Sequence, residues 1–279
     1  MTDQTFPDLE VLLATGPGAL GAPAGSRLRH SPDEPELCSL YAHPPAPDGR
    51  SALVRASMIS TIDGAAWGDD GRSGSINGQA DYRAFRVMRA LADIVLVGAG
   101  TVRTERYVPL KVPRGLTAAR EAAGRATHLH TAVVTRSGHL PEAMAGAAGD
   151  TAAQQPYVVT CEAGRRNLPA SVPADRVVVS GDEQVDLADA LDTLAARGFT
   201  RVLCEGGPTL LGSMLEADLV DEMCLTTSPQ VLGGSAARPV ITSDVLTDRP
   251  AARLAHLLHA DGVLLARWTI RQTEPAPVV

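Results

Sequence analysis

The 279-residue chain carries 32 acidic and 25 basic residues, a net charge of −7, and lysine is almost absent. This balance excludes a broadly basic surface for nucleic acid or for an anionic membrane, so an anionic ligand must meet local arginines. The four cysteines form neither a zinc C-x-x-C pair nor a disulfide framework. No signal peptide is recognised, and no apolar run approaches the ~20 residues of a membrane helix. We expect a cytoplasmic protein that requires no metal.

Residues 1–50 mix proline and glycine with one apolar patch at 9–13. We expect a loosely packed extension with a short helix there. One ordered domain is expected over 51–272, followed by a tail at 273–279.

Ordered structure begins with an apolar strand at 53–60. A helix follows, capped by Asn77 and ending near Leu91, with a buried stripe that includes Tyr82 and Phe85. The run at 94–97 is apolar on both faces, as in an inner parallel strand, and leads into Gly98. Residues 104–128 are irregular, with a helical turn near 118–123, and are a candidate lid over a site.

Further along the chain, strands and helices alternate, which favours a largely parallel sheet. Strands are expected at 131–135, 157–161 and 176–180, and a helix at 186–197 is stopped by Gly198. A second strand at 201–205 runs into Gly206 and Gly207, and Pro208 suits the first turn of the next helix. Strands at 222–227, 254–259 and 262–270 follow, the last two joined by a turn at Asp261. Two strand-glycine-helix junctions at one sheet edge predict a nucleotide site, although glycines also simply turn chains.

Four segments occur in an order and spacing that resemble the pyrimidine reductase domain of bacterial riboflavin biosynthesis. They are SMISTIDG at 57–64, GAGTV at 98–102, EGGPTL at 205–210, and DE at 221–222 followed by SPQVLGG at 228–234. The resemblance spans about residues 51–270 and is greatest to stand-alone actinobacterial members. It implies a dihydrofolate-reductase-like α/β fold, with a mostly parallel central sheet flanked by helices and a C-terminal antiparallel hairpin. Because the zinc deaminase motifs of the bifunctional members are missing here, it implies a reductase only.

The resemblance also implies the reaction: a ribosylaminopyrimidine 5′-phosphate opens to an imine, and NADPH gives hydride to C1′ of the sugar, leaving a ribitylamine. It places Ser73 and Arg89 near the substrate phosphate or sugar, and Glu205 on the ribose hydroxyls. A guanidinium suits phosphate, and a carboxylate accepts from hydroxyls. The alternatives are a solvated helix arginine for Arg89 and a helix charge partner for Glu205. Glu105 and Ser57 border the reaction centre as the catalytic candidates.

For NADPH, the resemblance implies contacts from both glycine junctions, with residues 207–213 wrapping the diphosphate. The implied cofactor residues, besides Glu105, are Ile59, Ser75, Gly98, Gly100, Thr101, Val102, Gly206, Gly207, Pro208, Thr209 and Leu210. Thr135, Arg136 and Ser137 follow a strand and are candidates for the 2′-phosphate, with a plain polar turn as the equal alternative.

Two departures from the family leave the substrate open. Family members commonly carry Lys or Asn where this chain has Ser57, and Asp where it has Glu105. The alternatives to the pyrimidine reductase are a dihydrofolate or pterin reductase and a non-catalytic NADPH-binding protein. Because late antiparallel strands leave an edge that must be covered, and because leucines occur on both faces of the hairpin, we also expect a two-fold homodimer built on the C-terminal strands.

Overall fold

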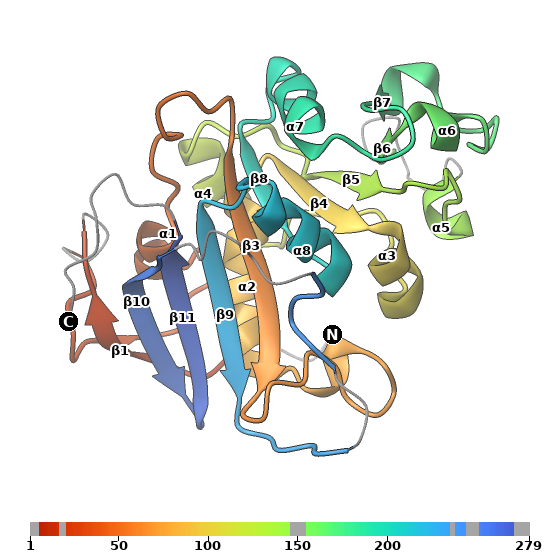
Figure 1. Cartoon of the computed structure of the whole chain (residues 1–279). Helices are drawn as coiled ribbons and strands as arrows, with labels where there is room; N and C mark the ends of the chain where they lie inside the picture. Colours follow the sequence, from red (N-terminus) through yellow and green to blue (C-terminus); the bar gives the residue numbers. More distant parts are fainter. Residues whose placement is uncertain (1–5, 17–20, 146–154, 235–237, 244–250, 271–279) are drawn as a thin grey trace.

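The computed structural model describes residues 6–16, 21–145, 155–234, 238–243 and 251–270, and the expected tail lies outside these ranges. The described strands form one 11-stranded sheet (Figure 1). Its spatial order is β2 (Arg27–Leu28), β1 (Leu9–Ala14), β10 (Arg253–Ala260), β11 (Val263–Thr269), β9 (Glu222–Ser228), β3 (Leu53–Thr61), β8 (Arg201–Cys204), β4 (Ile94–Gly98), β5 (His130–Val134), β6 (Tyr157–Thr160) and β7 (Val177–Val179). The strands from β9 to β7 pair in parallel, and the hairpin β10–β11 joins β9 in antiparallel fashion. The expected fold class is therefore confirmed.

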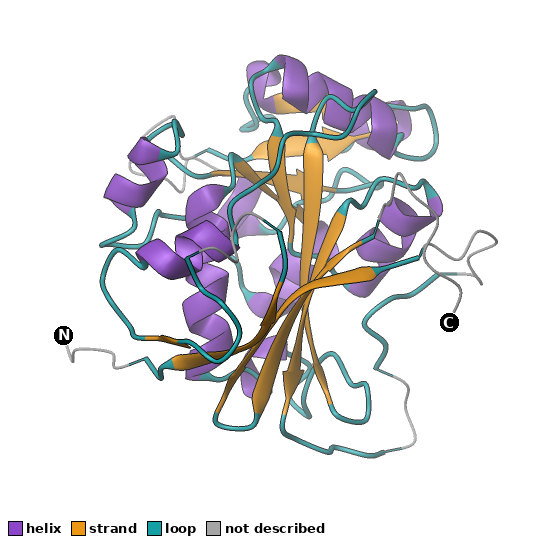
Figure 2. Ribbon diagram, turned by 90° about the vertical axis from the view of Figure 1, so that its left-hand side faces the viewer, coloured by secondary structure: helices purple, strands orange, loops and turns teal. Residues whose placement is uncertain are grey.

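Helices cover both faces of the parallel part of the sheet (Figure 2). They are α1 (Pro35–Leu40), α2 (Gln79–Leu91), α3 (Ala99–Glu105), α4 (Thr117–Ala122), α5 (Glu142–Ala145), α6 (Glu162–Arg165), α7 (Leu187–Ala196) and α8 (Pro208–Glu216). On one face, Val87 of α2 belongs to the same buried cluster as Leu203 and Leu258 of the sheet. On the other face, Leu194 of α7 and Met214 of α8 pack over the strands. Within the described ranges, no helix has the length and apolarity needed to span a membrane.

Most expected elements are present within one or two residues of their expected bounds, and two details of α2 differ. Gly78, not Asn77, is the N-cap residue of α2. Tyr82 is 39% exposed rather than buried, because its position on α2 faces away from the sheet and toward Phe6. The candidate lid contains the expected helical turn, which is α4.

The N-terminal segment is where the sequence-based expectation was wrong. The expected short helix is present as α1 (Pro35–Leu40), but residues 9–14 form strand β1, in which Leu9 and Val11 are fully buried. Apolar side chains at alternate positions, separated by Glu10, have the period of a half-buried strand. The segment pairs with β10, so it is an integral strand of the sheet and not a loose extension.

A buried arginine fixes this segment to α2. The Arg83 guanidinium, 1% exposed, donates to both carboxylate oxygens of Glu34, at 2.7 Å from Nε and 2.5 Å from Nη2. It also donates to the carbonyl oxygens of Pro7, Leu28 and Arg29. Every polar group of this buried ion pair therefore has partners, which is the condition under which a charge can be buried.

The pairing of β1 with β10 also overturns the premise of an open edge at the C-terminal hairpin. Strand β10 lies between β1 and β11, so its backbone groups are hydrogen-bonded on both sides. The hairpin nevertheless has two apolar faces. Leu258 and Leu265 are buried on the α2 side. On the other side, Leu257 is half-buried and Leu264 is 37% exposed.

His256 of β10 supplies a test of how the fold responds to acid. Its ring is 1% exposed and meets the Tyr41 ring edge-on at 4.6 Å. Burial, followed by the charges of Arg267 and Arg55, lowers the pKa of His256 to about 3. The unfolded chain therefore takes up the proton first, near pH 6.5, and the contribution of neutral His256 to stability is lost as the pH falls below that value.

We expect His256→Gln to lose less unfolding free energy than the wild type between pH 7.5 and 5.0. The difference should approach about 1.4 kcal/mol per pH unit below 6.5, which corresponds to one proton. Urea unfolding at the two pH values measures it. His259→Gln, on the same strand but 38% exposed at its side chain, is the matched control. Equal acid sensitivity in the wild type and His256→Gln would contradict the assignment.

Candidate functional site

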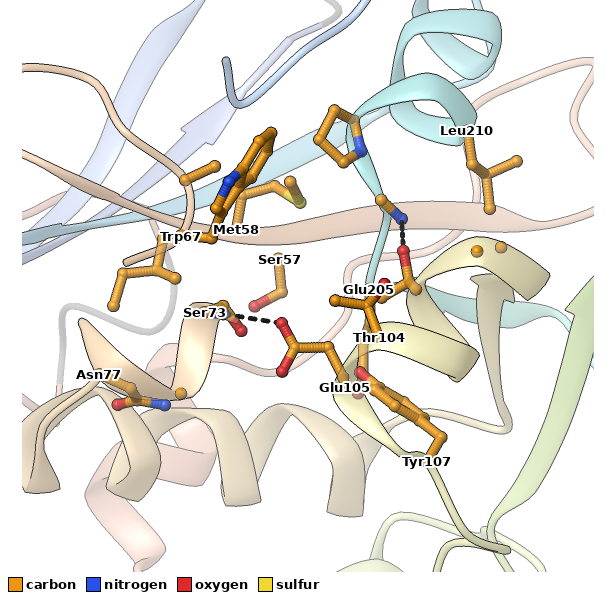
Figure 3. Close-up of a pocket in the computed structure, with 18 of the residues that line it drawn as sticks. Ser57, Met58, Trp67, Ser73, Asn77, Thr104, Glu105, Tyr107, Glu205 and Leu210 are labelled. Carbon is orange, nitrogen blue, oxygen red and sulfur yellow. Dashed lines mark hydrogen bonds between the residues drawn. The ribbon is translucent and has the colours of Figure 1, made fainter. Parts of the chain in front are cut away.

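A cavity of about 510 Å³ opens at the carboxyl ends of β3, β4 and β8, beside α2, α3 and the first turn of α8 (Figure 3). Its volume lies within the range of small-molecule sites. The structure brings most of the sequence-predicted site residues together there. Those that line the cavity are Ser57, Ile59, Ser73, Arg89, Gly98, Gly100, Thr101, Glu105, Glu205, Gly207, Pro208, Thr209 and Leu210.

Glu105, Ser73 and Ser57 gather in one part of this cavity (Figure 3). Glu105 is the last residue of α3, and its Oε1 accepts a hydrogen bond from the backbone N–H of Ser73 at 2.7 Å. Ser73 begins a short 3-10 turn that precedes α2, and Ser57 is a half-buried residue of β3. The bond to Ser73 fixes the Glu105 carboxylate while leaving its second oxygen available to a ligand.

Arg89 and Glu205, predicted to hold different parts of a substrate, are paired with each other. Arg89 Nε and Nη2 donate to Glu205 Oε1 and Oε2, both at 2.7 Å, in a bidentate fork. The Tyr107 hydroxyl donates to Oε2 at 2.6 Å, and the Arg89 guanidinium lies 4.1 Å from the Phe85 ring centroid. The pair thus compensates a carboxylate that is only 2% exposed at the end of β8.

The local electrostatics keep this group of residues in fixed protonation states. Burial, reinforced by the nearby Glu205 carboxylate, raises the pKa of Tyr107 well above its usual value, so its hydroxyl stays a donor. Burial alone would lower the pKa of Arg89, but the adjacent Glu205 outweighs it and the pKa is raised. The guanidinium uses Nε–H and one N–H of Nη2 on Glu205 and also hydrogen-bonds Tyr107, which leaves part of its N–H groups for a ligand.

The two glycine junctions lie against each other at the opposite side of the cavity. The Gly98 N–H donates to the carbonyl of Gly206 at 2.8 Å, and the Gly207 N–H donates to Thr101 Oγ1 at 2.8 Å. A Cβ at Gly207 would lie 2.4 Å from Thr101 Oγ1. These two amides are therefore occupied, whereas the first turns of α3 and of α8, which both border the cavity, carry N–H groups without a partner inside their helix.

Six predicted cofactor residues do not line the cavity. Val102 is 1% exposed in the core beneath α3, and Ser75 Oγ bonds Asp70 Oδ1 at 2.7 Å. The others outside the cavity wall are Gly206, Thr135, Arg136 and Ser137. The last three follow β5, the neighbour of β4 in the sheet, and Arg136 is exposed to solvent.

The sequence reasoning missed several cavity residues, of which Asp81 and Asn77 are the most informative. Asp81 is 8% exposed, and the Thr226 hydroxyl donates to its Oδ1 at 2.5 Å. Asn77 also hydrogen-bonds Asp81, and burial raises the Asp81 pKa to about 6. An acidic residue in the first turn of a helix looks like a favourable dipole partner, so nothing local marked it as a site residue. Trp67, Thr104 and Tyr107 were likewise missed as cavity residues.

No cluster of three or more metal-type ligands occurs within the described ranges.

Comparison with known proteins identifies a family for the chain. The RibD C-terminal domain family matches residues 52–269. A 2,5-diamino-6-ribosylamino-4(3H)-pyrimidinone 5′-phosphate reductase of Methanothermobacter thermautotrophicus is 31% identical over 201 residues, covering 69% of this chain and 83% of the relative. The riboflavin biosynthesis protein RibD of Mycobacterium tuberculosis is 30% identical over 183 residues, covering 65% of this chain and 43% of that protein.

Solved structures agree on the fold. A pyrimidine reductase-like protein from Corynebacterium diphtheriae superimposes with a TM-score of 0.70 at 23% identity, covering 79% of this chain and 92% of that one. RibD of Acinetobacter baumannii gives a TM-score of 0.61 at 25% identity over 79% of this chain and 58% of its own. With the family match spanning most of its length, the chain belongs to the RibD C-terminal domain family.

Proposed function

We propose that this protein is an NADPH-dependent reductase of a ribosylaminopyrimidine 5′-phosphate, which delivers hydride to C1′ of the sugar imine and releases a ribitylamine. The observation that carries the proposal is that one cavity joins the first turn of α8 to Glu105 and to the Arg89–Glu205 pair. A family member of similar extent is named as a reductase of such a substrate.

The residues at the glycine junctions fit a nicotinamide dinucleotide. NADPH, when bound, supplies the hydride. In the proposal, the free amides of Thr209 and Leu210 face the diphosphate at the positive end of α8. Gly207 has to be a glycine for the two junctions to meet, because a Cβ there would lie 2.4 Å from Thr101 Oγ1.

The Arg89–Glu205 pair suits the sugar and phosphate of the substrate. Glu205 Oε1, which accepts one hydrogen bond, retains acceptor capacity for a ribose hydroxyl, and the Arg89 N–H groups not used on Glu205 or Tyr107 can donate to a phosphate oxygen. A folate-type site needs a free arginine for a carboxylate and no acidic residue for ribose. Because the Glu205 carboxylate lines the cavity, the geometry favours the ribosyl-bearing pyrimidine over a folate.

Glu105 is proposed to manage the proton of the reaction, with Ser57 beside it. Opening the sugar ring moves a proton between the glycosidic nitrogen and the ring oxygen, and hydride addition to the imine carbon leaves the nitrogen to be protonated. The Glu105 carboxylate is anchored by Ser73 and faces the cavity.

The direct test of the proposed function is to incubate the purified chain and NADPH with the 2-amino and deaminated pyrimidine phosphates and with dihydrofolate, and to follow NADPH absorbance. Turnover of dihydrofolate alone would refute the proposal.

For the cofactor, we expect Gly207→Val to abolish binding of both NADPH and NADH, because its side chain would collide with Thr101. Arg136→Ala should weaken NADPH only, by roughly tenfold to a hundredfold for one lost phosphate contact. Dissociation constants for the two cofactors measure both effects. Equal weakening of NADH by Arg136→Ala would remove Arg136 from the 2′-phosphate.

For the substrate, we expect Arg89→Lys to raise KM for the phosphorylated substrate by roughly tenfold, because lysine keeps the charge but loses the fork. The effect should shrink greatly for the dephosphorylated analogue. Arg86→Lys, one turn away and bonded to the Arg114 carbonyl, is the matched control. An equal effect on both substrates would leave Arg89 as a support for Glu205 and exclude a phosphate contact.

We also propose that the protein is a homodimer through the sheet face formed by β9, β11 and β10, which no helix covers in Figure 1. Leu257, Ala266 and Leu225 are register neighbours in a row on that face, and each is half-buried. Light scattering should give twice the 29.1 kDa chain mass. Leu257→Arg should yield monomers, whereas Val231→Arg, a 70% exposed position elsewhere, should not. A wild-type monomer would refute the interface.

A further inference from the structure

The Tyr107 hydroxyl is held against the Arg89–Glu205 pair by the fold of its own segment. Tyr107 follows Arg106, which caps the end of α3 in the left-handed conformation with φ of 55°. Its backbone N–H donates to the carbonyl of Val102 at 3.0 Å, and its ring packs against the buried cluster that contains Val102. Because these contacts use the backbone and the ring, they place the hydroxyl without the help of a ligand.

The two oxygens of the Glu205 carboxylate are not equally available. Oε2 accepts from Arg89 Nη2 at 2.7 Å and from the Tyr107 hydroxyl at 2.6 Å. Among the described residues, Oε1 accepts a side-chain hydrogen bond only from Arg89 Nε, at 2.7 Å. An ionised carboxylate has about two acceptor positions on each oxygen. The chain therefore fills both positions of Oε2 and leaves one position on Oε1.

The exposure of Glu205 agrees with a single contact to a ligand. Glu205 and Tyr107 both line the cavity (Figure 3), but only 2% of the Glu205 side chain is exposed. So small an opening admits one hydroxyl group and not two side by side.

The Tyr107 hydroxyl is itself engaged on both sides. It donates to Glu205 Oε2 and also hydrogen-bonds the Arg89 side chain, so the three groups close a ring. Burial, reinforced by Glu205, raises the pKa of Tyr107 well above its usual value, so the hydroxyl keeps its proton and remains a donor. It therefore occupies the position on Oε2 that a second hydroxyl of a ligand would otherwise take.

We propose that Tyr107 is a specificity-determining positioning residue, which restricts the Arg89–Glu205 pair to one hydroxyl of the substrate sugar. This inference rests on the proposed function. Ribose carries neighbouring 2′ and 3′ hydroxyls, and a carboxylate with both oxygens open can accept from the two together. With Oε2 occupied by Tyr107, one of these hydroxyls donates to Oε1 and the other has no contact with the carboxylate.

The test is to titrate the chain, with NADP+ present, with D-ribose 5-phosphate and its 2-deoxy and 3-deoxy counterparts by isothermal calorimetry. In the wild type, loss of the contacted hydroxyl should weaken binding by roughly tenfold to a hundredfold, as for one hydrogen bond to a charged group. Loss of the other hydroxyl should leave the affinity nearly unchanged. In Tyr107→Phe, which keeps the ring and frees Oε2, both deoxy sugars should bind more weakly than ribose 5-phosphate and to a similar degree.

Tyr157→Phe is the matched control, because it removes a hydroxyl from a half-buried tyrosine of β6 that lies outside the cavity wall. It should keep the discrimination of the wild type. A Tyr107 that only supports packing would give a different result, since its Phe variant would weaken all three sugars by the same factor. That outcome would contradict the inference.

Binding of these sugars needs no turnover, which separates this inference from the proposed function. If the pyrimidine phosphates are not reduced, but the wild type discriminates between the deoxy sugars and Tyr107→Phe does not, the proposed function fails and the role of Tyr107 stands. Equal weakening by both deoxy sugars in the wild type, unchanged discrimination in Tyr107→Phe, or no binding of ribose 5-phosphate would overturn the inference.

Discussion

The parallel register of β3, β8 and β4 is the constraint on which the site depends. Their backbone pairing runs from Leu53 with Arg201 and from Ile94 with Val202, so the three strands end at the same edge of the sheet. Each chain segment that leaves this edge contributes to the cavity: the glycine junction into α3, the glycine junction into α8, and the loop that leads to α2. A slip of one residue in any of these pairings would turn the buried side chains to the other face.

Buried arginines then hold the irregular segments against this sheet. Arg55 is fully buried and donates to Glu222 and to the carbonyl of Tyr41, which fixes the segment after α1. Arg120 similarly donates to the carbonyls of Ala90 and His128. Long planar donor groups satisfy several backbone carbonyls at once, which suits them to loops whose oxygens lack ladder partners. Such arginines position structure, and they are distinct from Arg89, whose remaining N–H groups face the cavity.

The polar groups of the cavity fall into two sets. Near α3 and β8, the carboxylates of Glu105 and Glu205 are each oriented by a donor from the chain. At the other end, Asp81 has only neutral donors. Groups that the chain already holds in place suit the positioning of a bound ligand.

The sequence by itself determined the features that depend on local chemistry. Apolar runs of strand length, glycines at strand ends and Pro208 in the first turn of α8 are properties of a few neighbouring residues, and the structure has each of them at the expected position. Most members of the candidate site were implied by the family resemblance, which rests on motifs contained in single segments. The order and alternation of the elements likewise indicated the parallel sheet.

Only the tertiary structure decided which distant groups meet. Strand β1 alternates apolar residues at its start, but its partner is β10, some 240 residues away along the chain, and no local pattern identifies that partner. Arg89 and Glu205 lie 116 residues apart, so their roles were assigned separately although they form one pair. Asp81 became a cavity residue through its contact with Thr226, 145 residues away. Side-chain pairing across a fold is set by packing and solvation in three dimensions, and no local pattern records it.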